Sequence, residues 1–351
     1  MNEAGKTTTV IVDAMGGDNA PDAVIHGLSD AAELFPVRYV IVGNRDAVLP
    51  LCEKYGLSSD KYTLVHTDEV LGMEDDPLAV VRKKKNCSMG IALQHLRDGD
   101  GDVMLSAGNT GALHAGSSLL VRPMKGIHRA AIATVLPFTK PTLLLDAGAN
   151  TNVTAEYLEQ WARLGAVYMK YVLGVKSPTV GLLNNGTEQH KGTAVAAEAW
   201  QRLSAAEGLN FIGNVEGSDI PYSPADVIVT DGFTGNITLK FAEGMGSFLF
   251  GKLKELFGAG ARTKIAYLLM KKVLRGFKHE FDASEYGGAP LIGLTKPVIK
   301  AHGNSDAGAI CAAVRQAVSF AGTDIIPQFE AVAELYRDMP GEEQNMQNIS
   351  E

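Results

Sequence analysis

Short runs of β-branched and other apolar residues recur along the chain and are followed by turn residues. Runs of this length are typical of buried strands. Helix-like stretches at 79–96, 155–172 and 194–206 separate several of the runs. Such alternation predicts an α/β protein with a mostly parallel sheet. The expected strands lie at residues 10–12, 39–42, 63–65, 103–105, 131–135, 143–145, 180–183, 211–212 and 227–229.

The organisation along the chain is continuous. No internal repeat, low-complexity tract or Pro/Ser-rich linker marks a boundary in the 351 residues, which are enough to bury a large core. We therefore expect one α/β unit over 1–351, with a helical insertion at 245–280.

Glycine is enriched: it accounts for 38 of 351 residues, about 11%, against an ordinary level of about 7%. Glycine turns follow five of the expected strands. Carboxyl ends of parallel strands meet at one edge of a sheet, and ligands bind there. Glycine lets backbone N–H groups approach a ligand, and a following helix favours an anion. Tight turning alone explains any one of them, but the whole set favours a polar cleft for an anion. The turns lie at 13–18, 106–112, 146–150, 184–188 and 231–236.

Composition narrows the function classes. The net charge of −8 argues against a general nucleic-acid binder. Three cysteines are too few and too scattered for a disulfide framework or a zinc site, so a reducing cytosol is expected. The chain shows no signal peptide and no bilayer-spanning run. Phosphate-loop, dinucleotide-binding, nucleophile-elbow and zinc-protease motifs are absent, so we expect no metal and no cofactor.

The remaining candidates for chemistry are amides and a lysine. Lys191 follows an expected strand, beside Glu188, and Asn236 ends the last glycine turn. Lysine and asparagine hold phosphate or donate to an oxyanion. An exposed, solvated lysine is the alternative for Lys191, and a cap or core residue is the alternative for His302. Cys87 is better explained as a small residue at a helix start than as a nucleophile.

These groups suit a reaction whose nucleophile arrives already activated, as inorganic phosphate does near neutral pH. The protein then has to position phosphate against an acyl carbonyl and to stabilise the oxyanion. The sequence is compatible with such a step but does not by itself select it.

Basic residues concentrate at 247–278, where eight Lys or Arg stand against one acid. At helical spacing several of them share a face opposite apolar residues. A basic amphipathic helix favours an anionic membrane surface or an acidic partner. An ordinary surface helix packed by its apolar face, as at a dimer interface, is the alternative. The candidate contact residues are Lys252, Lys254, Lys264, Lys271, Lys272, Arg275 and Lys278.

Six ordered blocks together resemble the bacterial phosphate acyltransferase family of phospholipid synthesis, PlsX. The blocks are IVDAMGGDNAP, RKKKNCSMG, SAGNTGAL, LLLDAGAN, GLLNNGTEQHKG and DVIVTDGFTGNITLK. Departures are few: Cys87 stands where serine is commoner, Ser218 replaces a frequent basic residue, and Asn185 occupies a variable position.

The resemblance implies transfer of a fatty acyl group from acyl carrier protein to inorganic phosphate. It also implies a three-layer α/β/α fold similar to isocitrate dehydrogenase and phosphotransacetylase, and a homodimer. By position, Lys191 and Asn236 match the family's catalytic residues. The positions carried over as substrate or phosphate lining are Gly16, Gly17, Asp18, Asn109, Thr110, Gly111, Asn150, Asn184, Glu188, Asp231, Gly232, Thr234, Gly235 and His302.

The resemblance further implies a cytoplasmic protein associated peripherally with the inner face of the cell membrane. There its product would feed a glycerol-3-phosphate acyltransferase. Alternative functions are a phosphotransacetylase acting on acyl-CoA, a non-catalytic adaptor that binds acyl carrier protein, and an isocitrate-type dehydrogenase. The basic insertion argues against the first of these. The polar turns argue against the second, and the lack of an acidic metal cluster argues against the third.

Overall fold

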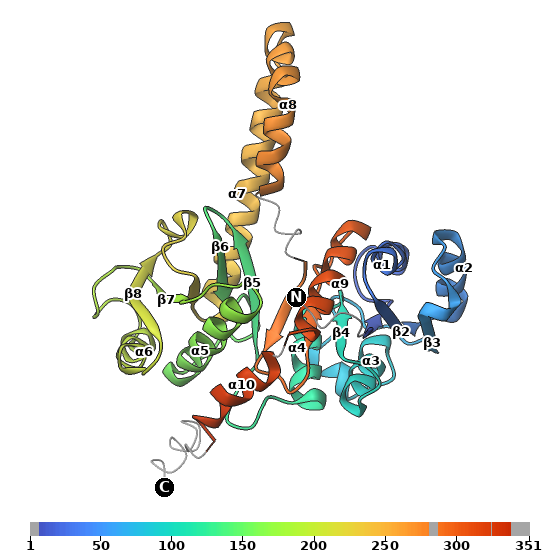
Figure 1. Ribbon diagram of the computed structural model, residues 1–351, viewed down its shortest axis with the longest axis horizontal. Helices are drawn as coiled ribbons and strands as arrows, with labels where there is room; N and C mark the ends of the chain where they lie inside the picture. Colours follow the sequence, from blue (N-terminus) through green and yellow to red (C-terminus); the bar gives the residue numbers. More distant parts are fainter. Residues whose placement is uncertain (1–6, 281–286, 324, 338–351) are drawn as a thin grey trace.

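The structure, a computed structural model, describes residues 7–280, 287–323 and 325–337 (Figure 1). Within this part, one eleven-stranded sheet has the order β3-β2-β1-β4-β11-β10-β5-β6-β9-β7-β8. The strands β1 to β11 are Thr8–Asp13, Val37–Gly43, Tyr62–His66, Val103–Ser106, Ala131–Pro137, Pro141–Leu145, Thr179–Asn184, Asn210–Glu216, Val227–Val229, Ala289–Ile292 and Val298–Lys300.

Helices cover both faces of the sheet. The α-helices α1 to α10 are Asp22–Leu34, Arg45–Tyr55, Ser88–Asp98, Thr110–Gly116, Ala155–Tyr171, Ala194–Ala205, Gly232–Gly258, Ala261–Glu280, Ala307–Ala321 and Ile325–Glu334. Short helical turns occur at Ser59–Lys61, Pro77–Val81, Ser117–Val121 and Ile220–Tyr222. All nine strands expected from the sequence lie inside observed strands, so the α/β class and the mostly parallel sheet are confirmed.

Alternation along the central strands builds the layers. On β1, Val10 and Val12 enter a core with α1 and α9, whereas Ile11 enters a second core with α3. On β6, Leu143 and Leu145 join the core under α5, and Leu144 joins the opposite one. Successive side chains of a strand point to opposite faces, so each strand serves two buried cores. The result is a three-layer α/β/α architecture.

Strand direction divides the sheet into two wings. In the N-terminal wing β3, β2, β1, β4 and β11 are parallel, and in the C-terminal wing β6, β9, β7 and β8 are parallel. Between the wings, β10 is antiparallel to both β11 and β5, and β5 is antiparallel to β6. The carboxyl ends of the two wings therefore point in opposite directions.

The expectation that all five glycine turns share one edge is wrong for this reason. It assumed a single parallel direction through the sheet. The direction reverses at β10, which is antiparallel to β11 and β5, and again between β5 and β6. Strand β10 has only four residues, and β11, the last strand of the N-terminal wing, has three. Runs so short were not recognised as strands in the sequence.

The helix expected at 79–96 is confirmed over residues 88–96, inside α3, and is wrong over 82–87, where the chain turns between Pro77–Val81 and α3. Cys87 caps α3, with its Sγ accepting from Gly90 N at 3.4 Å. A Cβ on Gly90 would lie 2.6 Å from the carbonyl oxygen of Lys85, so the chain doubles back tightly here. The helices expected at 155–172 and 194–206 are confirmed as α5 and α6.

Helices α7 and α8 pack against each other and project from the body as a hairpin (Figure 1). Helix α7 begins at Gly232, inside the last glycine turn, so the helix that carries Asn236 continues into the hairpin. Within the described residues, no single helix is long and apolar enough to cross a bilayer. In the same described part of the chain, α9 and α10, with a bend of 64° between them, meet that test of length and composition as a pair.

Candidate active site

Three neighbouring strands of the C-terminal wing, β6, β9 and β7, are followed by the segments that carry Asn150, Asn236 and Lys191. Asn150 and Lys191 lie in loops, and Asn236 lies near the start of helix α7. We call these segments the C-terminal set. Adjacent parallel strands place the loops after them side by side. Lys191 and Asn236 are both half-buried. Among the described residues, no carboxylate lies within ion-pair distance of the Lys191 ammonium, so this charge is available to an anion.

Backbone-directed contacts shape the Lys191 loop. Asn184 Nδ2 donates to the carbonyl of Lys191 at 3.0 Å, and Lys191 N donates to the carbonyl of Glu188 at 3.1 Å. Gly192 has a φ of +90°, and a Cβ there would collide with Asn184 Oδ1. Asn184 and Glu188 therefore act in the structure by holding the loop, and the Glu188 side chain is exposed.

Asp231 and Thr234 belong to the start of α7. Asp231 Oδ1 accepts from Thr234 N at 2.9 Å, and its Oδ2 accepts from Thr234 Oγ1 at 2.7 Å. This is an N-cap, which satisfies one of the free N–H groups of the first turn. Both residues stabilise the helix end that presents Asn236.

Gly232 and Gly235 are required by close packing. Gly232 N donates to the carbonyl of Asn150 at 2.7 Å, and a Cβ on Gly232 would lie 2.7 Å from Asn150 N. A Cβ on Gly235 would overlap the carbonyl oxygen of Asp146. The first turn of α7 thus lies directly on the loop that follows β6. Gly148, in that loop, has a φ of +138°, and its Cβ position is 3.2 Å from Asn236 Cγ.

Asp146 was not among the predicted residues, although it contacts Asn150 and lies against Gly232 and Gly235. It is fully buried at the end of β6. Asn150 is 3% exposed, and its Nδ2 donates to Asp146 Oδ2 at 2.9 Å and to the carbonyl of Ala130 at 2.9 Å. These two donations orient the amide, and within the described residues Asn150 Oδ1 is buried without a hydrogen-bond partner.

The remaining predicted residues form an N-terminal set after β1, β4 and β11, which are also neighbours. Asp18 N donates to the carbonyl of Gly303 at 2.7 Å. Gly17 has a φ of +110°, and a Cβ on Gly16 would lie 2.8 Å from Gly108 N. The structure therefore brings Gly16, Gly17 and Asp18 against the loops after β4 and β11.

The other members of the N-terminal set have varied positions. Asn109 caps α4 through Oδ1, which accepts from Ala112 N at 3.0 Å, and donates to the carbonyl of Met73 at 2.8 Å. Thr110 is half-buried at the start of α4, and the Cβ position of Gly111 lies 3.0 Å from Pro77. His302 is exposed, and its carbonyl accepts from Ser305 N.

A buried acid and a buried lysine lie beneath this set. Asp13 accepts from Ser88 Oγ at 2.6 Å and from Ser106 Oγ at 2.7 Å, and burial raises its pKa despite these donors. Lys300 is 8% exposed and donates to the carbonyls of Ala107 and Ala301. Burial lowers the pKa of Lys300 to about 8. Neither residue was predicted.

Helix α4 connects the two sets. It begins at Thr110 in the N-terminal set, and one turn later His114 Nε2 lies 3.0 Å from the carbonyl oxygen of Ala130. The same oxygen accepts from Asn150 Nδ2 in the C-terminal set. Four residues of helix span about 6 Å. The two sets are therefore bridged by a single helical turn, even though their strands run in opposite directions.

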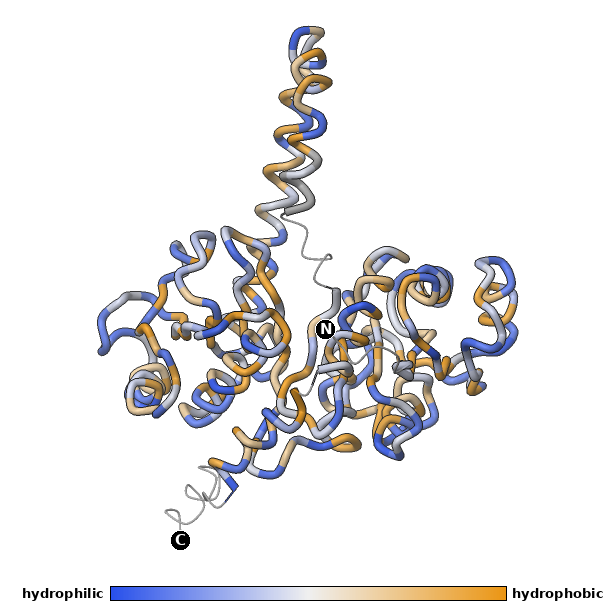
Figure 2. The backbone as a smooth tube through the Cα atoms, in the orientation of Figure 1, coloured by the Kyte–Doolittle hydropathy of each residue, from blue (hydrophilic) through white to orange (hydrophobic). Residues whose placement is uncertain are grey.

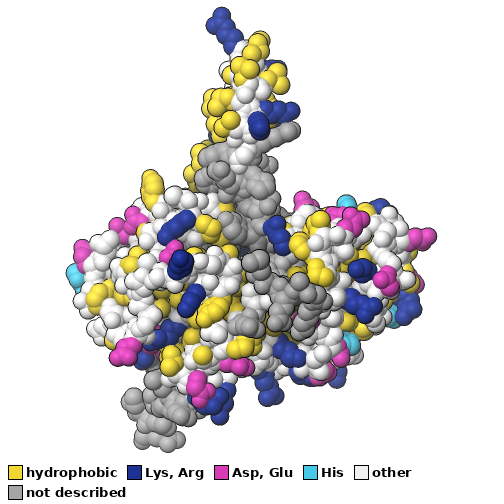
Figure 3. Space-filling model, viewed as in Figure 1, with side chains coloured by type: hydrophobic (Ala, Val, Ile, Leu, Met, Phe, Trp, Pro, Cys, Tyr) yellow, Lys and Arg dark blue, Asp and Glu magenta, His cyan; other side chains and the backbone are white. Residues whose placement is uncertain are grey.

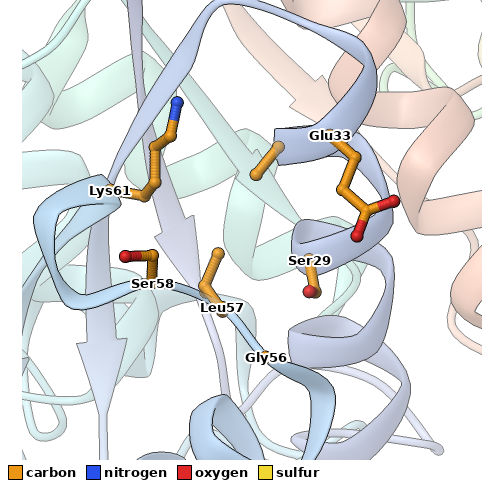
Figure 4. A pocket seen from close by; sticks show the side chains of 7 residues that line it. Ser29, Glu33, Gly56, Leu57, Ser58 and Lys61 are labelled. Carbon is orange, nitrogen blue, oxygen red and sulfur yellow. The ribbon is translucent and has the colours of Figure 1, made fainter.

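Other sites are less favourable. Burial raises the pKa of the Cys87 thiol to about 11, which argues against a nucleophilic thiol. In the described part of the chain, no cluster of His, Cys, Asp and Glu fits a metal ion. A cavity of about 130 Å³ lies beside α1, and no predicted site residue lines it (Figure 4). Its lining residues are Ser29, Ala32, Glu33, Gly56, Leu57, Ser58 and Lys61.

The α7–α8 hairpin carries apolar and basic side chains together. Orange segments run along both helices in Figure 2, and Figure 3 shows yellow side chains with Lys and Arg near the end of the hairpin. Lys252, Lys254, Lys264 and Lys272 are exposed and Lys271 is half-buried, whereas the side chains of Arg275 and Lys278 lie outside the described part. Exposed apolar residues include Phe241, Phe248, Leu249, Leu256, Ile265, Leu268, Leu269 and Val273.

Comparison with known proteins identifies relatives over nearly the whole chain. Residues 8–328 match the family model described as fatty acid synthesis protein. The phosphate acyltransferase of Caldanaerobacter subterraneus subsp. tengcongensis is 44% identical over 329 residues, which cover 93% of this chain and 98% of the relative. The phosphate acyltransferase of Streptococcus pneumoniae is 43% identical over 323 residues, 91% of this chain and 97% of the relative.

Solved structures support the fold. A phosphotransacetylase from Streptococcus pyogenes superposes with a TM-score of 0.63 at 18% identity, covering 90% of this chain and 94% of that one. The EutD phosphotransacetylase from Staphylococcus aureus superposes with a TM-score of 0.59 at 15% identity, covering 90% of this chain and 95% of that one. The expected likeness to phosphotransacetylase is confirmed at the level of the fold. By the match over residues 8–328 and the identity to its curated relatives, the chain belongs to the phosphate acyltransferase family, PlsX.

Proposed function

We propose that the protein transfers a fatty acyl group from acyl carrier protein to inorganic phosphate. The bond formed joins a phosphate oxygen to the acyl carbon, and the bond broken is the thioester. The products are acyl phosphate and the free thiol of the carrier, which takes up one proton. The observation that carries this proposal is that Lys191, in the loop after β7, and Asn236, near the start of helix α7 after β9, follow adjacent strands. Membership of the family supports it.

The proposed mechanism uses Asn236 to donate from Nδ2 to the thioester carbonyl oxygen, where negative charge develops in the transition state. Lys191 supplies the positive charge of the site, either to the attacking phosphate or to the oxyanion. Phosphate is largely ionised near neutral pH, so no general base has to activate it. Catalysis then rests on positioning and electrostatic stabilisation.

The N-terminal set is proposed to hold the phosphate across helix α4. Glycine turns at 16–17 and at 108 leave room for a close anion, and Lys300 lies buried beneath them. Helix α4 links this set to Asn150, and Asn150 contacts the first turn of α7. Phosphate held at the start of α4 is therefore proposed to react at Asn236. Residues 1–351 accordingly act as one catalytic unit.

The test of this function is incubation with palmitoyl-[acyl carrier protein], with and without phosphate. Carrier thiol and hydroxylamine-trappable acyl phosphate are measured together, and acetyl-CoA serves as the alternative acyl donor. Phosphate-dependent appearance of both products from the carrier thioester supports the proposal. A folded protein that forms neither product contradicts it and favours the adaptor alternative.

The hairpin is proposed to place the enzyme at a membrane and to pair it with a second copy. Leu268 and Leu269 are 67% and 82% exposed near basic residues, a combination that suits an anionic lipid surface. Phe233, Ile237 and Phe241, nearer the body on α7, offer apolar surface for a homodimer. We propose the inner face of the cell membrane as the place of action, where a glycerol-3-phosphate acyltransferase would use the acyl phosphate.

Liposome sedimentation tests the membrane contact. The double variant Lys271→Glu and Lys272→Glu should lose most binding to anionic vesicles, because repulsion replaces attraction. A matched charge reversal on the body, Lys83→Glu with Lys85→Glu, should leave binding unchanged. Equal binding by the hairpin variant would refute the electrostatic contact. Light scattering after size exclusion measures the oligomeric state of each variant.

A further inference from the structure

One buried carboxylate organises the loop beneath the catalytic asparagine. Asp146 Oδ1 accepts from the backbone N–H groups of Ile132, Gly148 and Ala149, at 3.0, 3.1 and 3.1 Å. Its Oδ2 accepts from Ala149 N at 3.1 Å, from Asn150 N at 2.6 Å and from Asn150 Nδ2 at 2.9 Å. A carboxylate has about four lone-pair sites. Five of the six hydrogen bonds come from residues 148–150, and the sixth, from Ile132 N, ties the carboxylate to strand β5.

The loop in turn fixes the start of α7. Asp146 Oδ2 lies 2.9 Å from the Cβ position of Gly232, and the Asp146 carbonyl lies against Gly235. No side chain fits at either glycine, so the first turn of α7 rests directly on Asp146 and Asn150. Asn236 is one residue beyond Gly235, and its Cγ lies 3.2 Å from the Cβ position of Gly148. Movement of the 147–150 loop therefore moves the surface on which the Asn236 amide rests.

We propose that Asp146 is a positioning residue that acts through Asn236. It holds residues 147–150 in the conformation that sets where the Asn236 amide points, and it does not touch substrate. This inference rests on the proposed role of Asn236 in acyl transfer. A misplacement of about 1 Å in a catalytic group costs on the order of 100-fold in rate.

The chemistry of the donors explains why an aspartate is needed. All six hydrogen bonds to Asp146 come from N–H groups, so the residue acts purely as an acceptor. In Asp146→Asn one oxygen becomes an NH₂ group that faces backbone donors. The side chain keeps its size while one half of the loop loses its acceptor. The loop then relaxes, and Asn236 loses its support at Gly148.

A double-mutant cycle tests the coupling, since residues that act through one another are not additive. The variants are Asp146→Asn, Asn236→Ala and the pair, assayed for kcat and for the KM of phosphate and acyl carrier protein. Asp146→Asn should lower kcat about 100-fold. The double variant should be no more than about three-fold slower than Asn236→Ala alone. Rate losses that multiply would overturn the proposal, because a purely structural role acts independently of Asn236.

A crystal structure of Asp146→Asn gives a readout that needs no activity. The proposal predicts displacement of the Asn236 amide from Gly148 with α7 otherwise intact, and an unmoved amide overturns it. If wild-type protein forms no acyl phosphate, the proposed function fails, yet this structural outcome still decides the positioning role. If wild type is active and the rate losses of the two single variants multiply in the double variant, only the positioning role fails.

A second perturbation covers the case in which Asp146→Asn does not fold. Gly148→Ala leaves both carboxylate oxygens of Asp146 in place as acceptors and puts a methyl group against Asn236 Cγ. Its matched control is Gly174→Ala, which also has a positive φ, +73°, but has open space around its Cβ position. Gly148→Ala should lower kcat and should be non-additive with Asn236→Ala, whereas Gly174→Ala should only lower stability. Equal effects of the two alanines on kcat would contradict the proposal.

Discussion

The two wings of the sheet each end a buried strand in an aspartate that sits under a glycine loop, and they satisfy that carboxylate differently. Asp13 accepts from two serine hydroxyls at 2.6 and 2.7 Å and from Met15 N at 3.3 Å, and it lies near the buried Lys300. All hydrogen bonds to Asp146 come from N–H groups, and most of these are backbone groups of its own loop. Hydroxyl donors can rotate, but backbone donors fix the chain that carries them. The C-terminal wing is thus built to hold a loop in one conformation.

The difference matches the division of labour proposed for the wings. A reacting carbonyl needs donors within tenths of an ångström, so the loop under Asn236 is tied at every N–H group. An anion such as phosphate needs charge and exposed N–H groups, which glycine turns over a buried lysine provide. The N-terminal wing is therefore expected to set phosphate affinity, and the C-terminal wing is expected to set the rate of the chemical step.

The largest expected effect is that of Lys191→Ala in the C-terminal wing. Loss of the positive charge should lower kcat by on the order of 1,000-fold, because a group that stabilises transition-state charge contributes several kcal/mol. Lys176→Ala, an exposed lysine in an earlier loop, is the control and should retain its rate. Carrier-thiol release measures both variants. A near-normal rate in Lys191→Ala would remove this residue from the mechanism.

Asp13→Asn is expected to affect binding more than chemistry. The loop under Gly16 should shift while the C-terminal set stays intact, so the KM for phosphate should rise about ten-fold with kcat changed less than about three-fold. Asp146→Asn should give the opposite pattern. Steady-state kinetics over a range of phosphate concentrations measures both. If the two variants change the KM for phosphate and kcat in the same way, the proposed difference between the wings is wrong.

Lys300 predicts a pH dependence of stability confined to the N-terminal wing. Burial disfavours the charge and lowers the pKa of Lys300 in the folded state from its ordinary value of 10.5 to about 8. Between these values the unfolded chain keeps a proton that the folded chain has released. The free energy of unfolding therefore gains up to about 3 kcal/mol from this group as pH rises through that window.

Urea unfolding of wild type and Lys300→Met from pH 7 to pH 10.5 measures this effect. Lost hydrogen bonds to Ala107 and Ala301 contribute equally at every pH, so only the difference between the two curves matters. The free energy of unfolding of Lys300→Met, relative to that of wild type, should decrease as pH rises. Asp13 and Asp18 face Lys300 and oppose the shift in its pKa. Parallel curves would show that burial does not perturb this lysine.

The two helix caps give the smallest expected effects. Asn109→Ala and Asp231→Ala should each cost about 1 kcal/mol of stability. Asp231→Ala should also lower kcat, because α7 presents Asn236, whereas Asn109→Ala should mainly raise the KM for phosphate. Thermal melting together with kinetics measures both properties. A larger loss of kcat in Asn109→Ala than in Asp231→Ala would contradict the assignment of the chemical step to the C-terminal wing.

Much of the architecture follows from local sequence pattern. Apolar runs such as Leu143–Leu145 are buried on both faces, and their continuous hydrophobicity identified them as strands. Strand direction does not follow from such runs, because pairing partners are set by packing far along the chain. Strand β10, antiparallel to both of its neighbours, and the antiparallel pair β5–β6 therefore divide the expected single edge into two sets of loops.

The candidate site was predicted unevenly for a similar reason. Turn residues such as Gly235 and Asn236 are visible in the sequence, but the buried groups beneath them resemble ordinary strand ends. A signal did exist: Asp13 and Asp146 each follow a buried apolar run and precede alanine and glycine, in VDAMGG and LDAGAN. Lys300 has no comparable signal, since its burial depends on the loops after β1 and β4.

In the proposed reaction, phosphate itself attacks the acyl carbonyl held by the C-terminal set. The most direct measurement uses ³³P-labelled phosphate with palmitoyl-[acyl carrier protein] and compares label in acyl phosphate with carrier thiol released. The account predicts about one labelled phosphate for each thiol in wild type, and loss of both products together in Lys191→Ala. Thiol release without labelled acyl phosphate would show that water is the nucleophile and would contradict the account.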